Sequence, residues 1–120
     1  MTSKDLNLRM IEALPQITKK YVEETEWQEK DETGSHVVYA DVFVPFVYET
    51  FTTNDEVLLT KIFQFIENLI KLKDDYADEV VHLSVLEKLY YEDEIGKKQL
   101  ECFMKSETLK KWKTFSLEQK

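Results

Sequence analysis

The chain has 120 residues, of which 42% are hydrophobic and 33% are charged, as is typical of one folded domain. Its single cysteine, Cys102, excludes an internal disulfide and any metal site made of several cysteines. Two glycines are too few for a phosphate-binding loop or a dinucleotide fingerprint. We therefore expect one domain over residues 1–120, with neither a metal nor another cofactor.

Charge is unevenly distributed along the chain. The net charge is −8; seven lysines and three glutamates from Lys97 onward give that end +4, which leaves −12 on residues 1–96. An acidic surface repels nucleic acid and anionic membranes and attracts basic proteins. The N-terminus lacks the apolar run of a secretory signal, and no stretch has the length of a transmembrane helix, so we expect a cytoplasmic protein.

The first two expected helices lie on either side of Pro15. Ser3 is the expected N-cap of the first helix, which should end at the proline because proline disfavours helical geometry in the residue before it. Apolar residues recur at helical spacing on both sides of the proline: Leu6, Met10, Ile11 and Leu14, then Ile17, Tyr21 and Val22.

An acidic stretch follows the second helix. It contains one large apolar residue, Trp27, and ends at an expected turn around Gly34. The stretch is either the solvated end of a helix or an acidic patch whose aromatic residue anchors a basic partner. The acids that form the candidate patch are Glu23, Glu24, Glu26, Asp31 and Glu32.

Residues 36–51 leave two structures open. Their valines favour a strand, and a β-hairpin across Gly34, within residues 21–44, is an alternative. The run is long for a strand, however, and its apolar residues follow the i, i+3, i+4 spacing of a helix. We therefore expect a helix that Pro45 kinks.

Residues 53–72 form the expected central helix. Thr53 and Glu56 have the spacing of a capping box. Apolar side chains occupy about half of the helix circumference, and the polar half includes Glu67. Because so wide an apolar surface needs neighbours on two sides, we expect this helix to lie inside a helical array.

Three further helices are expected after the central one. Asp74 is the expected N-cap of a helix over residues 75–91, whose apolar residues point in nearly all directions and so require enclosing neighbours. A shorter helix over residues 95–104 and a last helix capped by Ser106 follow it. The expected fold is all-α, a single compact array of five or six antiparallel helices similar to a helical-repeat module.

Few residues indicate catalysis or metal binding. His36 and His82 are far apart in the sequence, and no metal-binding motif surrounds either. We expect His82 to be a hydrogen-bonded core residue and Cys102 to pack in the interior. Asp41 and Glu87 interrupt apolar runs, so we expect both to be partly buried, as helix caps, as ion pairs or as catalytic groups.

Three segments carry a family resemblance: YADVFVPF at residues 39–46, KIFQFIENL at 61–69 and VHLSVLEKL at 81–89. They resemble the small helical immunity proteins that bacteria encode beside polymorphic or contact-dependent growth-inhibition toxins. The resemblance covers residues 36–117 and implies a protein that binds one toxin domain and blocks its active site. It transfers no functional residue, because the binding surfaces of these proteins diverge with their toxins.

Three hypotheses follow. The first is an immunity protein, monomeric before binding, that neutralises a basic toxin domain such as a nuclease. The second is a generic helical adaptor whose apolar groove receives a partner helix. The third is an enzyme with Asp41, Glu87 and His82 in one catalytic pocket. We disfavour it, and we expect no enzyme, because the sequence contains no catalytic motif. The candidate partner-binding residues are Glu23, Glu24, Glu26, Trp27, Asp31, Glu32, Tyr90, Tyr91, Glu92, Asp93 and Glu94.

Overall fold

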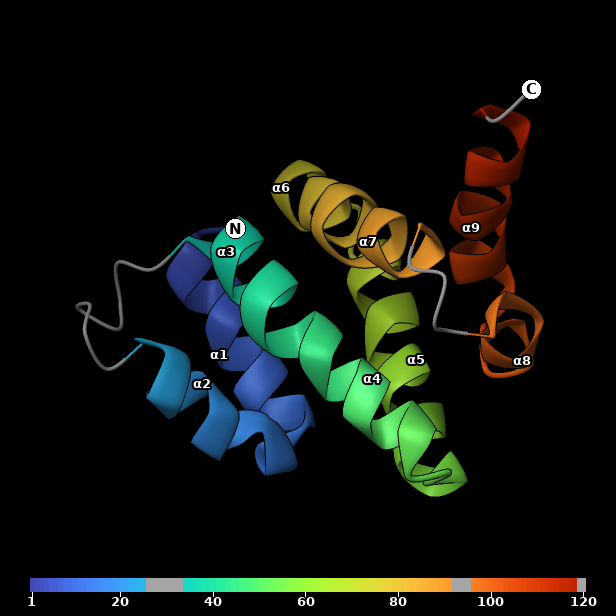
Figure 1. Ribbon diagram of the computed structural model, residues 1–120. Coiled ribbons are helices and arrows are strands. Elements are labelled where there is room, and N and C mark those ends of the chain that lie inside the picture. Colours follow the sequence, from blue (N-terminus) through green and yellow to red (C-terminus); the bar gives the residue numbers. More distant parts are fainter. Residues whose placement is uncertain (26–33, 92–95, 119–120) are drawn as a thin grey trace.

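The computed structural model describes residues 1–25, 34–91 and 96–118, and it shows helices throughout (Figure 1). These residues form seven continuous helices and no strand, which confirms the predicted all-α class. Residues 26–33, part of the alternative hairpin, lie outside the described residues. The elements in chain order are α1 (Ser3–Ala13), η1 (Pro15–Ile17), α2 (Thr18–Thr25), α3 (Ser35–Val38), η3 (Tyr39–Phe43), α4 (Val44–Thr52), α5 (Glu56–Lys71), α6 (Asp75–Glu79), η4 (Val80–Leu86), α7 (Glu87–Tyr90), α8 (Lys97–Glu101) and α9 (Ser106–Glu118).

A capping box begins α1 one residue earlier than predicted. The N-cap is Thr2 and not Ser3: the Thr2 hydroxyl accepts from the Asp5 N–H, and the Asp5 carboxylate accepts from the Thr2 N–H. The hydroxyl of Ser3 instead contacts the Tyr76 hydroxyl at 2.7 Å and accepts from the Ser35 N–H, so it links α1 to α6 and α3. As predicted, α1 ends before the proline turn η1.

Two long helices each contain a π-helical segment. The α3–α4 helix runs through η3, the α6–α7 helix runs through η4, and these two π segments contact each other. A π segment has an i→i+5 hydrogen-bond pattern, so it rotates the following residues relative to α-helical spacing. Pro45, which has no N–H to donate, follows η3 directly as the second residue of α4.

The turn between α4 and α5 corrects another predicted cap. Asp55 is the N-cap of α5, because its carboxylate accepts from the Leu58 N–H. The Thr53 hydroxyl instead donates to the carbonyl oxygens of Glu49 and Thr50, and so completes the end of α4. The predicted capping box is therefore wrong, although the helix begins close to its predicted position.

Helix α5 is the inner helix that its wide apolar surface predicts. It contacts α4, α6, η4 and α9. Complete burial of one large apolar side chain contributes about 1.5–3 kcal/mol, so this helix supplies much of the core. Its buried apolar residues are Leu59, Ile62, Phe63, Phe65, Ile66, Leu69 and Ile70.

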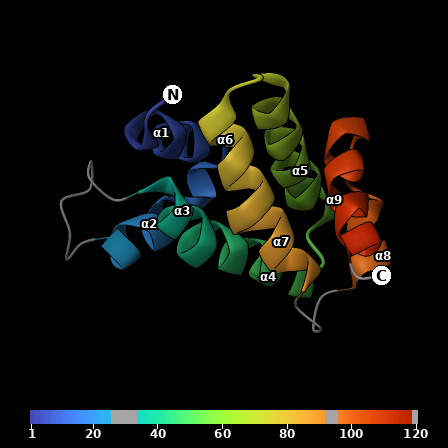
Figure 2. The ribbon, with the colours of Figure 1, turned by 90° about the horizontal axis from the view of Figure 1, so that it is seen from above.

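The helices form an array with distinct ends. Helices α1 and α2 lie at one end, α8 and α9 lie at the other, and the two long helices lie between them (Figures 1 and 2). The two long helices run in roughly the same direction, because in both views each begins towards the end that carries α1 and α2 and ends towards the end that carries α8 and α9. Alternate helices of an antiparallel array are related in this way.

None of the helices that the structure describes combines the length and apolar character needed to cross a lipid bilayer.

Candidate functional site

The structure describes only some of the predicted partner-binding residues. Glu23 and Glu24 are exposed near the end of α2. Tyr91 is 47% exposed, whereas Tyr90 packs against Trp112 and Phe115 and is 8% exposed. The predicted residues that lie outside the described ones are Glu26, Trp27, Asp31, Glu32, Glu92, Asp93 and Glu94.

The outward side of the two long helices combines acids with exposed apolar residues. These helices together contain six acids and one lysine. Val37 and Leu83 are 50% and 45% exposed, Asp41 and Glu79 are exposed, and Glu87 is half-buried. Among the described residues, these three acids form no ion pair with a lysine or arginine. We call these five residues the acidic face.

A polar contact joins the two helices beneath this face. His36 Nδ1 lies 2.6 Å from Ser84 Oγ, and His36 Nε2 lies 3.6 Å from a Glu79 carboxylate oxygen. Either the ring nitrogen or the Ser84 hydroxyl can donate this hydrogen bond, depending on the tautomer of His36. Val37 and Leu83 are the sequence neighbours of the two bonded residues, and both are about half-exposed.

The same contact has the residue types of a serine nucleophile, a base and an acid. A catalytic site also needs a cavity for substrate and donors for an oxyanion. Ser84 is buried, however, and it does not line the α4–α7 hollow or the hollow beside α9 that are described below. We therefore interpret the contact between His36 and Ser84 as a link between two helices.

A hollow of about 480 Å³ lies between α4 and α7, and we call it the α4–α7 hollow. It borders the acidic face, because its residues Ala40 and Lys88 are next in sequence to Asp41 and Glu87. Its lining combines three apolar residues with four polar or charged ones. The lining residues are Ala40, Val44, Pro45, Tyr48, Glu49, Thr52 and Lys88.

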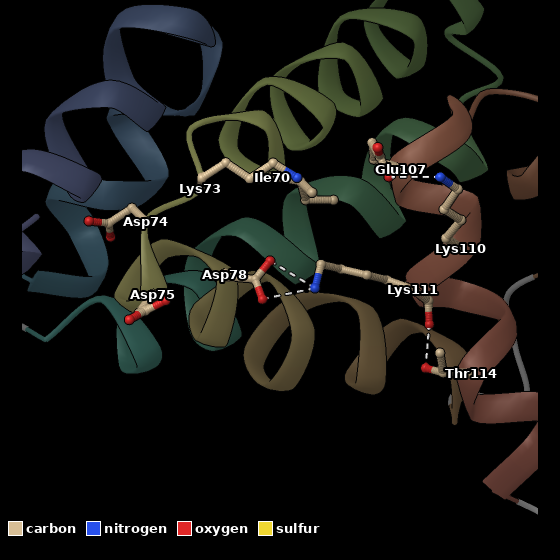
Figure 3. Close-up of a pocket in the computed structure, with 9 residues that line it drawn as sticks. All are labelled: Ile70, Lys73, Asp74, Asp75, Asp78, Glu107, Lys110, Lys111 and Thr114. Atoms are coloured by element: carbon tan, nitrogen blue, oxygen red, sulfur yellow. Dashed lines mark hydrogen bonds and ion pairs between the residues drawn. The ribbon is translucent and has the colours of Figure 1, made fainter.

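A second hollow, of about 520 Å³, lies between the turn after α5, the beginning of α6 and α9 (Figure 3). Lys111 reaches across it from α9, and its ammonium lies 2.8 and 2.9 Å from the two carboxylate oxygens of Asp78. On α9, Glu107 pairs with Lys110 at 3.5 Å. Because these charges neutralise one another, the hollow offers a partner less unpaired charge than the acidic face does.

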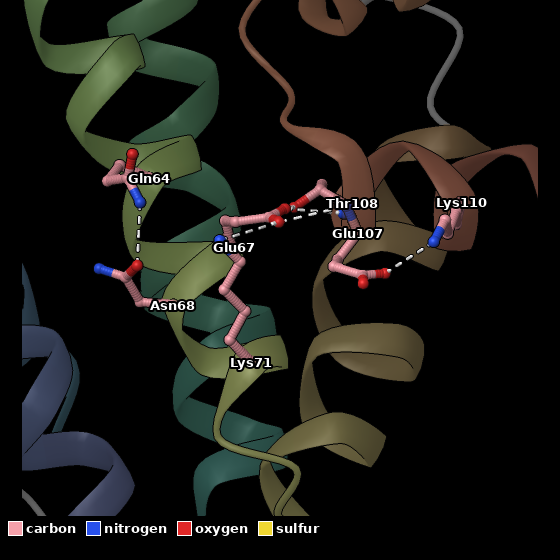
Figure 4. A network of polar contacts seen from close by, with 7 residues as sticks. All are labelled: Gln64, Glu67, Asn68, Lys71, Glu107, Thr108 and Lys110. Carbon is pink, nitrogen blue, oxygen red and sulfur yellow. Dashed lines mark hydrogen bonds and ion pairs between the residues drawn. The ribbon is translucent and has the colours of Figure 1, made fainter.

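Behind this hollow, a buried carboxylate caps α9 from a neighbouring helix (Figure 4). Glu67 of α5 has no exposed surface, which corrects its predicted place on the polar side. Its two carboxylate oxygens accept from the backbone N–H groups of Glu107 and Thr108 and from the Thr108 hydroxyl, at 2.9–3.2 Å. The predicted cap, Ser106, is the first residue of α9 and makes none of these contacts.

Hydrogen bonding determines the ionisation of Glu67. Burial by itself would raise the pKa of Glu67, but its polar neighbours hold this pKa below the usual value. These neighbours are the N–H and hydroxyl of Thr108, the N–H of Glu107 and the Lys71 ammonium, which lies 3.9 Å from the carboxylate. The carboxylate therefore stays charged at neutral pH. Its charge also favours the positive N-terminal end of the α9 dipole.

Other residues singled out from the sequence do not converge on a catalytic pocket. The ring of His82 stacks on the ring of Phe115 in α9, with 4.9 Å between the ring centroids. Asp41 is exposed on η3, and Glu87 is only half-buried. The expected partial burial of Asp41 is therefore wrong. Cys102 is exposed and not packed in the interior as expected.

His82 also differs from the expected hydrogen-bonded core residue. Its Nδ1 is buried and has no hydrogen-bond partner among the described residues. A buried nitrogen without a partner costs free energy, whereas a phenyl ring could keep the stack on Phe115 without that cost. We expect His82→Phe to raise the free energy of unfolding by about 0.5–1 kcal/mol in thermal denaturation at neutral pH. A clear loss of stability would show that this nitrogen is hydrogen-bonded in solution.

Sequence analysis singled out Asp41 and Glu87 as interruptions of apolar runs, but it did not identify Val37, Glu79 or Leu83 as part of the same surface. The regular spacing predicts that Val37 shares the buried side of its helix, but it is half-exposed. One available signal was the excess of acids over lysines in the two long helices. The pairing of these helices could not be read from the sequence.

The fold and this surface define the chain as an all-α protein with an acidic, partly apolar face on two parallel helices. Residues 7–119 match the family described as Domain of unknown function (DUF7674), and the chain therefore belongs to that family. Neither the comparison with curated proteins nor the comparison with solved structures finds a match.

Proposed function

We propose that the chain binds a basic protein partner through the acidic face, and that this partner is a bacterial toxin domain that it neutralises as an immunity protein. The observation that supports binding is the acidic face, where three acids without a lysine partner in the described structure surround two half-exposed apolar residues. Protein interfaces commonly combine apolar anchors with a polar rim in this way.

Charge supports a basic partner. The net charge of −8 attracts cationic proteins over long distances and accelerates their encounter with the chain. A nuclease domain binds phosphates through basic groups, so a surface of carboxylates can occupy the same groups and exclude the nucleic acid. In this proposal the chain acts in the cytoplasm by occlusion, as a monomer before binding and without catalysis.

The α4–α7 hollow supports a second candidate, a generic adaptor that receives a partner helix and has no toxin partner. The two candidates differ in their response to salt. Binding governed by the acidic face weakens as ionic strength rises, whereas binding governed by an apolar hollow changes little.

The partner is tested by co-expression with the product of the adjacent upstream gene, followed by affinity capture and a growth assay. If that product is toxic alone and harmless in a stable complex with the chain, the immunity proposal is supported. A neighbouring product that is harmless and does not bind would contradict it.

Charge reversal tests which surface binds. We expect the double variant Asp41→Lys and Glu79→Lys to slow association with the toxin about tenfold at low salt, because it reverses the local field at the acidic face. Stopped-flow measurements over a range of salt concentrations should also show a weaker salt dependence.

Two matched variants complete this experiment. Glu12→Lys with Glu56→Lys makes the same change in net charge at exposed positions outside the acidic face, and we expect a much smaller effect on association. Glu23→Lys with Glu24→Lys tests the patch predicted at the end of α2. If the face variant and the outside control slow association equally, the acidic face is not the binding surface.

A further inference from the structure

We infer that the acidic face and the adjoining α4–α7 hollow, which we together call the crevice, bind an amphipathic, basic helix of the partner, whose apolar anchor residues are two turns apart. This inference rests on the proposed function and specifies the shape and chemistry of the bound segment. Three features of the crevice support it: its two apolar positions, the distance between them and the charge around them.

The first apolar position is formed by the half-exposed Val37 and Leu83, one on each long helix, each next in sequence to a residue of the contact between His36 and Ser84. The second is the α4–α7 hollow, where Ala40, Val44 and Pro45 present an apolar lining. The volume of this hollow, about 480 Å³, lies within the usual range for sites that enclose a ligand group.

The spacing of the two positions suits a helix. Val37 and Pro45 are eight residues apart on the same helix, a rise of about 12 Å, and two turns of a partner helix rise about 11 Å. A helix lying along the crevice would therefore place one apolar residue on Val37 and Leu83 and another, seven residues later, in the hollow.

The charge of the rim determines the polar side of the bound helix. Asp41 lies one helical turn after Val37, Glu79 and Glu87 lie one turn before and after Leu83, and Lys88 is the one described cation that lines the hollow. Lysines or arginines beside the apolar anchors of the partner would therefore meet carboxylates. An acidic helix of the same shape would be repelled.

Synthetic helical peptides test the inference without the natural partner. The first peptide contains lysine and alanine with two leucines spaced two turns apart. The second has glutamate in place of lysine, and the third has the leucines on opposite sides of the helix. Fluorescence anisotropy of labelled peptides gives their affinities, and amide chemical shifts of the isotope-labelled chain give the location of binding.

We expect the first peptide to bind at least about tenfold more tightly than the other two and to shift amides along the crevice. Filling the hollow with Ala40→Trp or, at its exposed rim, Thr52→Trp should weaken that binding about tenfold, whereas Thr60→Trp, exposed on α5, should not. Equal binding of all three peptides, no binding, or amide shifts away from the crevice would overturn the inference. Because the peptides replace the partner, failure of the co-expression experiment remains a separate result.

Discussion

Replacing Glu67 with alanine is expected to lower the free energy of unfolding by about 3 kcal/mol. The substitution removes one buried carboxylate and leaves the N–H groups of Glu107 and Thr108 and the Thr108 hydroxyl without their acceptor. It also removes a negative charge from the N-terminal end of α9. For a chain of this length, the melting temperature should fall by about 10 °C in a thermal scan followed by circular dichroism.

Two substitutions on or near the same turn of α5 control for local effects. Asn68→Ala breaks only the exposed hydrogen bond with Gln64, so its effect on the free energy of unfolding should stay within about 0.5 kcal/mol (Figure 4). Glu67→Gln keeps the size of the side chain but loses its charge and one acceptor oxygen, so it should be intermediate. A Glu67→Ala chain as stable as Asn68→Ala would show that the buried carboxylate does not hold α9.

The effect of Glu67 should also depend on pH. Because the pKa of Glu67 is lower in the folded chain than in the unfolded chain, its stabilisation is fully present above the pKa of the unfolded chain. It is lost as the pH falls through the folded pKa, where the carboxylate becomes protonated. The stability difference between the natural chain and Glu67→Gln should therefore be constant near neutral pH and shrink in acid.

The positions of the helices could be predicted from the sequence more accurately than the residues that cap them. The apolar periodicity identifies α5, and Asp74 caps α6 as predicted, with its carboxylate accepting from the Ala77 N–H. In contrast, Thr2 and Asp55 are the caps where Ser3 and Thr53 were expected. Adjacent residues can each supply a capping oxygen, and only the backbone geometry selects between them.

The candidate site depends on relations that a single sequence does not contain. Glu67 has polar neighbours at helical spacing, so its burial follows only from the arrival of α9 against α5. Val37 and Leu83 are half-exposed on helices that contain π segments, whereas the sequence was read with a constant α-helical period. The excess of acids over lysines was visible in the sequence, but the fact that the two acid-rich helices lie side by side was not.

Trp112→Ala is expected to have the largest effect on stability, a loss of about 4 kcal/mol. Trp112 is 2% exposed. Its ring and the ring of Tyr90 form an edge-to-face contact with 5.1 Å between the ring centroids, and Tyr90 also contacts Phe115. Removing the indole leaves a cavity between α7 and α9 and exposes the side of Tyr90. Circular dichroism should show a melting temperature lower by about 15 °C, and it avoids the fluorescence change caused by losing a tryptophan. Lys113→Ala, at the exposed next position, should melt within about 2 °C of the natural chain.

This variant also separates stability from binding. Helix α9 contacts α5, η4 and α7, and it contributes no residue to the acidic face. At a temperature well below its melting point, Trp112→Ala should therefore bind the toxin with nearly the affinity of the natural chain, whereas Asp41→Lys with Glu79→Lys should keep its fold and lose affinity. A large loss of affinity in folded Trp112→Ala would instead place the binding surface on or beside α9.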